Sequence, residues 1–101
     1  MGYKKEFYDY DGELFMPDGK GWSDSSWHND VCPKVTKFID KKETLEVIIW
    51  QNYVNPDLRE VDWGTRYSFV IESCDTYDVV FSSQTDSIED IKTLIQSVNF
   101  E

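Results

Sequence analysis

The sequence predicts an α+β fold: an antiparallel β-sheet of about four to six strands with one C-terminal amphipathic helix packed on one face. Three observations lead to this prediction. The 101 residues contain no alanine but 22 Val, Ile and Thr, a composition that favours strands over helices. Several segments alternate apolar and polar residues, and the last long segment has helical spacing. A chain of this length is expected to form one domain, residues 1–101.

The strand predictions follow from the alternation of side chains. In residues 44–50, Leu45, Val47 and Ile49 point to one face of the sheet. Residues 66–72 and 77–82 alternate in the same way, and the short connection between them suits a hairpin. Residues 35–39 form a further short strand. An Asp-Gly turn predicts another strand at residues 13–16. Each strand has one apolar face and one mixed face, as in a sheet covered on one side.

The C-terminal segment predicts the helix that covers the sheet. Ser87 is a suitable N-cap, and Glu89 and Asp90 fall in the first turn, where the helix dipole favours anions. The apolar residues recur at the three-to-four spacing of an amphipathic helix: Ile88, Ile91, Leu94, Ile95 and Val98. We expect this face to close the core.

The charge of the chain restricts its partners. Twenty acidic residues against ten basic ones give a formal net charge of -10, concentrated in residues 6–30 and 72–101. Such a polyanion repels nucleic acid and anionic lipid, but it attracts proteins that hold DNA or RNA. The simpler interpretation is that acidity only keeps a small protein soluble. We expect no direct nucleic-acid binding and no membrane insertion, because no apolar run approaches ~20 residues.

The segment 21–33 combines two Trp, the only His and a Cys. A metal site would use His28, Asp30 and Cys32, but a structural zinc normally takes four soft ligands. The structural interpretation is that Trp22 and Trp27 pin an irregular loop onto the sheet. We expect Cys32 and Cys74 to be reduced. The common enzyme motifs are missing from the sequence, so we predict no enzymatic activity, catalytic residue, cofactor or bound metal.

The segment 51–65 is long for a connection between two strands, and loops of this length are often functional. Asn55-Pro56-Asp57 starts a turn, with a single helical turn through residue 60. Tyr53 and Trp63 are candidate anchors for a partner, because Tyr and Trp often anchor interfaces. For Trp63, packing against the sheet edge is the alternative.

The tract Trp-Ser-Asp-Ser-Ser-Trp-His-Asn-Asp-Val-Cys-Pro at residues 22–33, followed by Asn-Pro-Asp-Leu-Arg-Glu at 55–60, resembles a pattern in small hypothetical proteins of phages and prophages. In size, acidity and lack of catalytic motifs, the whole chain is similar to anti-CRISPR proteins and other phage counter-defence inhibitors. Many of those bind a nucleic-acid-handling effector and occlude its basic groove. The resemblance implies a location in the host cytoplasm and transfers no functional residues.

The leading hypothesis is therefore an inhibitor that binds a basic nucleic-acid-binding protein, such as a Cas effector, and blocks it by steric and electrostatic occlusion. The alternatives are an immunity protein that neutralises a toxin nuclease, and an accessory module with a metal at His28 and Cys32. Either a monomer or a homodimer is compatible with the sequence. The candidate partner-binding residues are an N-terminal acidic group (Asp9, Asp11, Glu13, Asp24 and Asp30), a C-terminal acidic group (Asp75, Asp78, Glu89 and Asp90), and the aromatic residues Tyr53 and Trp63.

Overall fold

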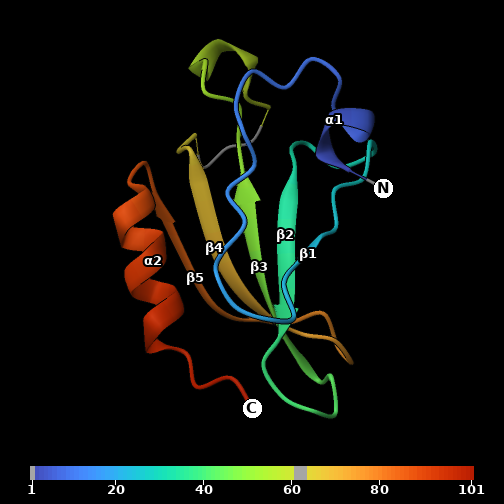
Figure 1. Cartoon of the computed structure of the whole chain (residues 1–101), viewed down its shortest axis with the longest axis vertical. Helices are drawn as coiled ribbons and strands as arrows, with labels where there is room; N and C mark the ends of the chain where they lie inside the picture. Colours follow the sequence, from blue (N-terminus) through green and yellow to red (C-terminus); the bar gives the residue numbers. More distant parts are fainter. Residues whose placement is uncertain (1, 61–63) are drawn as a thin grey trace.

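Five strands form one antiparallel sheet in the order β1-β2-β3-β4-β5, so that each strand pairs with the next along the chain (Figure 1). The computed structural model describes residues 2–60 and 64–101. The strands are β1 (Ser23–Asp24), β2 (Lys34–Phe38), β3 (Leu45–Gln51), β4 (Tyr67–Ser73) and β5 (Val79–Thr85). The helices are α1 (Tyr3–Glu6), the 3-10 turn η1 (Pro56–Leu58) and α2 (Ile88–Ser97). The predicted α+β class is confirmed.

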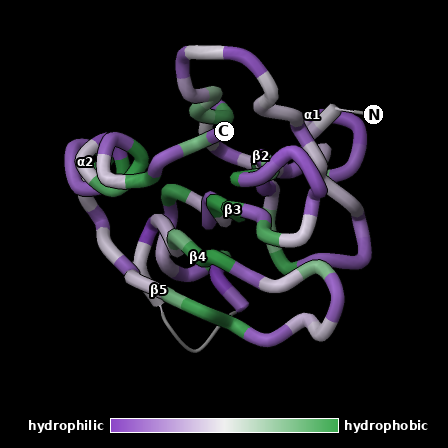
Figure 2. The backbone as a smooth tube through the Cα atoms, turned by 90° about the horizontal axis from the view of Figure 1, so that it is seen from below, coloured by the Kyte–Doolittle hydropathy of each residue, from purple (hydrophilic) through white to green (hydrophobic). Residues whose placement is uncertain are grey.

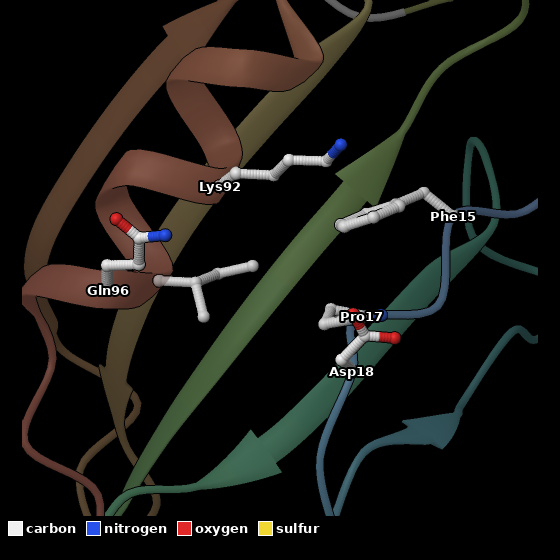
Figure 3. Close-up of a pocket in the computed structure, with 6 residues that line it drawn as sticks. Phe15, Pro17, Asp18, Lys92 and Gln96 are labelled. Atoms are coloured by element: carbon white, nitrogen blue, oxygen red, sulfur yellow. The ribbon is translucent and has the colours of Figure 1, made fainter.

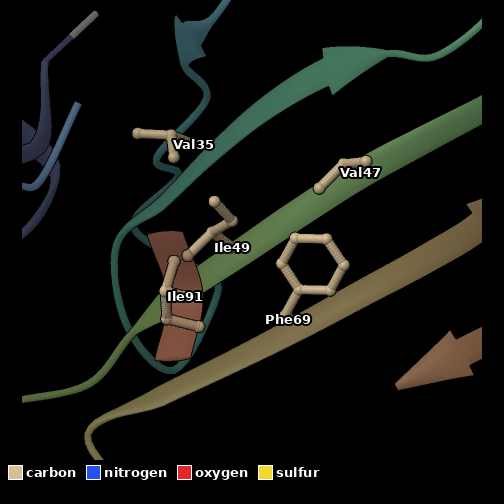
Figure 4. Close-up of a cluster of buried hydrophobic side chains, with 5 residues drawn as sticks. All are labelled: Val35, Val47, Ile49, Phe69 and Ile91. Atoms are coloured by element: carbon tan, nitrogen blue, oxygen red, sulfur yellow. The ribbon is translucent and has the colours of Figure 1, made fainter. Parts of the chain in front are cut away.

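The core lies between the sheet and α2. In the register of the strands, Ile49 of β3 lies opposite Val35 of β2 and Phe69 of β4. Ile91 of α2 packs onto this row together with Val47, and all five side chains are at most 1% exposed (Figure 4). The face predicted from Leu45, Val47 and Ile49 is therefore the face that α2 covers.

The helix α2 begins where the sequence predicted, with Ser87 at the N-cap position. The Ser87 side chain makes no capping hydrogen bond. Instead, Thr85 ties the two elements together: its Oγ1 accepts a hydrogen bond from the backbone N–H of Ser87 (3.0 Å) and donates one to Asp90 Oδ2 (2.6 Å). The other apolar residues of this segment are partly buried against the core: Ile88, Leu94 and Ile95 of the helix, and Val98 at its C-cap.

The N-terminal segment differs from the sequence prediction. Residues 13–16 form no strand, although Leu14 and Phe15 pack against the core. The reason is the fully buried side chain of Gln51: its amide donates to the Phe15 carbonyl and its oxygen accepts from the Phe15 N–H, both at 2.7 Å. One carboxamide thus replaces the backbone partner of a strand. The segment crosses the same face of the sheet as α2 (Figure 1).

The two loops confirm one prediction and modify another. Asn55 starts the single helical turn η1, and its side chain accepts a hydrogen bond from the Asp57 N–H (3.0 Å). In the 21–33 segment, Trp22 packs against the core and Phe100, as expected, but Trp27 is 48% exposed. Only one of the two tryptophans therefore pins this loop to the sheet.

Candidate protein-binding surface

The face of the sheet opposite α2 ends in a row of four residues that runs across β2 to β5. Glu46 of β3 lies opposite Phe38 of β2 and Glu72 of β4, and Glu72 in turn lies opposite Val79 of β5. Directly opposite residues share a face of the sheet and interact through their side chains. Phe38 is 39% exposed and Val79 is 58% exposed. The row therefore presents two carboxylates between two exposed apolar side chains.

A β-bulge in β5 widens the apolar end of this row. Ile71 pairs with Phe81, whereas the next residue, Glu72, pairs with Val79, so that Val80 is the extra residue. Bulges increase the local twist and redirect side chains. Val80 is 64% exposed, next to Val79. Two adjacent valines are thus both exposed, although in a regular strand successive side chains point to opposite faces of the sheet.

The turn between β4 and β5 adds an aromatic ring. The Ser73 N–H donates to the Asp78 carbonyl (2.9 Å), and the Tyr77 N–H donates to the Ser73 carbonyl (2.8 Å). These bonds close the turn with Tyr77 at φ 62°, in the left-handed region that bulky residues rarely adopt. Its side chain is 75% exposed. The turn therefore holds a large aromatic residue in solvent, in a conformation better suited to glycine.

The carboxylates of this region raise the pKa of neighbouring groups. Partial burial raises the pKa of Glu46, and the charge of Glu72 raises it further, while Lys34 opposes the shift. Burial also raises the pKa of the Cys74 thiol. Its further causes are the charges of four carboxylates that surround it: Glu46, Asp75, Asp40 and Glu72. Four carboxylates from β3, β4 and the adjoining turns therefore lie close enough together to act on the same thiol.

We call this region the sheet-end surface and define it by eight residues: Phe38, Glu46, Glu72, Asp75, Tyr77, Asp78, Val79 and Val80. Over residues 2–60 and 64–101, none of its four carboxylates lies within 4.0 Å of a Lys, Arg or His nitrogen. Exposed apolar groups next to carboxylates that form no close ion pair are typical of a surface that binds a partner of opposite charge.

Asp75 and Asp78 are among the partner-binding residues predicted from the sequence, whereas Glu46 and Glu72 are not. These two residues are 26 positions apart in the sequence, and only the register of β3 with β4 brings them together. Their direct pairing required knowledge of the strand register.

The other predicted C-terminal acids lie at the far end of β5. Glu89 and Asp90 belong to the first turn of α2, whereas Asp75 and Asp78 precede β5. Glu89 is exposed and lies 3.5 Å from Lys92, and Asp90 accepts the bond from Thr85. The four acids predicted as one group therefore bracket β5 as two pairs.

The N-terminal acids mostly bind within the chain. Asp9 accepts a hydrogen bond from the Tyr53 hydroxyl (2.9 Å), and Asp11 accepts from the backbone N–H groups of Val54 and Asn55 (2.8 Å each). Both carboxylates thus attach the N-terminal segment to the loop after β3. Tyr53 is only 7% exposed, so its ring packs inside the protein.

Two more members of that group also have internal partners. Asp24 accepts from the N–H groups of Tyr3 (2.8 Å) and Ser26 (3.1 Å), and Asp30 lies 3.2 Å from the Lys34 ammonium. Glu13 is exposed. The predicted anchor Trp63 lies outside the described residues. The acids that are adjacent in the N-terminal sequence are therefore not gathered into one surface.

The structure gives the predicted metal alternative no ligand set. Cys32 is fully buried, and burial raises the pKa of its thiol to about 12, which disfavours the thiolate that binds metals. The side chain of His28 is 63% exposed, and its Nδ1 lies 3.0 Å from Glu6 Oε1. Within the part of the chain that the structure describes, no three His, Cys, Asp or Glu side chains are grouped to hold a metal ion.

A shallow groove of about 310 Å³ lies on the other side of the molecule, between the N-terminal segment and α2 (Figure 3). Its lining consists of Phe15, Pro17, Asp18, Lys92, Ile95 and Gln96. The groove contains one cation and one carboxylate but no hydroxyl, thiol or imidazole side chain.

Comparison with protein-family models, curated proteins and solved structures finds no match to this chain. Among the described residues, no helix has the length and apolar character needed to cross a bilayer.

Proposed function

We propose that this protein is a binding protein of the phage-inhibitor type, which covers a cationic surface of a nucleic-acid-handling protein with its sheet-end surface. One observation carries the proposal: four carboxylates that form no ion pair within 4.0 Å among the described residues belong to the same surface as exposed Tyr77, Val79, Val80 and Phe38. Interfaces of high affinity combine apolar or aromatic anchors with charged groups that pair across the contact.

The paired glutamates favour a cationic partner in particular. Glu46 and Glu72 are direct cross-strand neighbours, and like charges in that position are unfavourable. Burial is the main cause that raises the pKa of Glu46, and Glu72 adds to it while Lys34 opposes it more strongly, so burial leaves this carboxylate poorly stabilised in the free protein. A Lys or Arg from a partner would compensate both carboxylates and lower that pKa. Binding would thus relieve an unfavourable interaction and form a new ion pair.

Inhibition would follow from occlusion. A protein that holds a phosphate backbone does so with Lys and Arg, and those groups are the ones that the sheet-end surface would cover. The net charge of -10 would speed the encounter of the two proteins and make it sensitive to ionic strength. The aromatic and apolar anchors would exclude water and slow dissociation.

The test begins with capture of partners from host lysate, followed by affinity measurements on the purified partner. The critical variant is the double substitution Glu46→Gln and Glu72→Gln. Its matched control is Asp18→Asn and Asp57→Asn, which changes the net charge equally at exposed positions elsewhere. We expect the critical variant to weaken binding at least about tenfold, and the control to change it by less than about threefold.

Two further measurements complete the test. The affinity of the wild-type protein should fall markedly between ~50 and ~200 mM salt, and a DNA or RNA ligand of the partner should compete with it. Affinity independent of salt, or an equal loss in the two double variants, would refute the proposal. The identity of the partner distinguishes a defence effector from a toxin nuclease.

A further inference from the structure

The strand β5 is an edge strand with a free outer side. Its residues, Val79–Thr85, pair with β4 along one side, and over the described residues no other backbone hydrogen bond involves them. Five consecutive pairs, from Phe81 opposite Ile71 to Thr85 opposite Tyr67, are regular. The outward N–H and C=O groups of this stretch therefore form a template to which a further strand can add.

Beyond the bulge at Val80, the sequence of β5 does little to block such pairing. Soluble proteins usually protect edge strands with lysine, with proline, with bulges or by making the strand very short. The strand at the other edge, β1, is only two residues long. In contrast, β5 contains no proline and no charged residue, and its first three residues are 58%, 64% and 44% exposed. Figure 2 shows this apolar stretch at the margin of the molecule.

The charges around β5 indicate what the added strand contains. Asp75 and Asp78 precede β5, and Asp86, Glu89 and Asp90 follow it. Asp86 lies 3.9 Å from Arg59 and Glu89 lies 3.5 Å from Lys92, whereas Asp75, Asp78 and Asp90 form no ion pair within the described residues. An extended segment with an uncharged centre and Lys or Arg at both ends can pair with Asp75 and Asp78 at one end of β5 and with Asp90 at the other.

A second copy of the chain is a poor match for this arrangement of charges around β5. In an antiparallel pairing of two β5 strands centred on Ser82, Asp78 of one copy lies opposite Asp86 of the other. Like charges directly opposite each other destabilise a sheet, and the two copies carry -10 each. Charge complementarity therefore favours a basic partner over a homodimer.

We propose that β5 accepts an extended segment of the partner as a sixth strand, with basic residues of that segment bound to the acids at the two ends of β5. The inference rests on the proposed function, because it specifies how the same basic partner is held. Main-chain hydrogen bonds along β5 supply affinity with little demand on sequence, and the flanking ion pairs position the segment.

The direct test is amide hydrogen exchange by NMR on the full-length, isotope-labelled protein. The probe is the synthetic peptide Lys-Arg-Val-Thr-Ile-Thr-Val-Lys-Arg. We expect alternate amides of Val79–Thr85, those that do not bond to β4, to exchange at least about tenfold more slowly with peptide bound. The same peptide with a central proline should give no protection, and one with glutamates in place of the basic residues should bind more weakly. A peptide that binds without protecting β5 amides overturns the inference.

Two proline variants provide an independent test. Neighbouring residues of a strand direct their N–H groups to opposite sides, so Ser82→Pro and Ser83→Pro remove one inward and one outward N–H. Thermal unfolding identifies the variant whose sheet remains folded, and this variant should no longer bind the peptide. Undiminished peptide binding by it overturns the inference. Slow amide exchange at β5 without peptide, together with a dimer in sedimentation, also overturns it in favour of self-association.

Binding measurements with the captured partner distinguish failure of this inference from failure of the proposed function. Salt-dependent binding that leaves the outward β5 amides unprotected overturns strand addition alone and leaves the sheet-end surface as the binding site. Binding that is insensitive to salt and to the Glu46→Gln and Glu72→Gln substitutions overturns the proposed function.

Discussion

We expect substitutions of Tyr77 to affect the stability of the protein and its affinity for a partner differently. Tyr77 has φ 62°, and a non-glycine residue in the left-handed region costs ~1–2 kcal/mol. Glycine removes that cost, but it loses ~0.5–1 kcal/mol through the greater freedom of the unfolded chain. Because the side chain is 75% exposed, removing it sacrifices only about 0.5 kcal/mol of burial. Tyr77→Gly should therefore be about as stable as the wild type, or slightly more stable.

Tyr77→Ala is the matched control, because it removes the same ring but retains the Cβ that opposes the left-handed conformation. It should lose about 0.5 kcal/mol relative to the wild type. The glycine variant should then be more stable than the alanine variant by about 0.75 kcal/mol, which corresponds to ~3–6 °C in Tm for a domain of this size. Thermal unfolding followed by circular dichroism measures this difference.

Binding should respond differently from stability. If Tyr77 is an anchor of the interface, both variants should bind the partner more weakly by about 1–2 kcal/mol, that is, roughly 5- to 30-fold, in calorimetry. A glycine variant less stable than the alanine variant would refute the argument from backbone strain. Full affinity in both variants would remove Tyr77 from the binding surface.

Three further expectations concern the core, the loop after β3 and the paired glutamates. Ile91→Ala should lower the free energy of unfolding by about 2–5 kcal/mol in urea denaturation, since Ile91 is fully buried; a loss below about 1 kcal/mol would contradict the packing of α2. Arg59 donates to the carbonyls of Tyr53, Val54 and Gly64, so Arg59→Lys should speed amide exchange in that loop, whereas unchanged exchange would argue against this clamp. Because the pKa of Glu46 is raised in the folded state, its favourable contribution is present below the ordinary pKa and is lost as pH rises through the folded value. Glu46→Gln should therefore be more stable than the wild type near pH ~7, by an amount that shrinks towards pH ~4; the opposite trend would contradict the raised pKa of Glu46.

The sequence predicted the parts of the fold that depend on local periodicity. The alternation around Val47 and the helical spacing around Ile91 each bury one face, and this requirement is the same wherever the element packs. The failed strand at residues 13–16 shows the limit of such reasoning. Its backbone partner is the side chain of Gln51, 36 residues after Phe15, and no local pattern indicates that contact.

The candidate surface was less predictable for the same reason. Acids that are close together in the N-terminal sequence, such as Asp9 and Asp11, are used to bind the loop after β3. The glutamates that do gather, Glu46 and Glu72, come from different strands and meet through the register. The composition therefore gives the total charge, but the positions of the acids along the chain do not predict where that charge is concentrated on the folded surface.

The single carboxamide of Gln51 has a consequence for the order in which the protein assembles. The hairpins β2–β3 and β4–β5 join residues close in sequence, so their loops close at little entropic cost. The N-terminal segment has no hairpin of its own, and the two hydrogen bonds of Phe15 can form only when Gln51 is already in place in β3. Docking of this segment should therefore be the last step of folding, and its release the first step of unfolding.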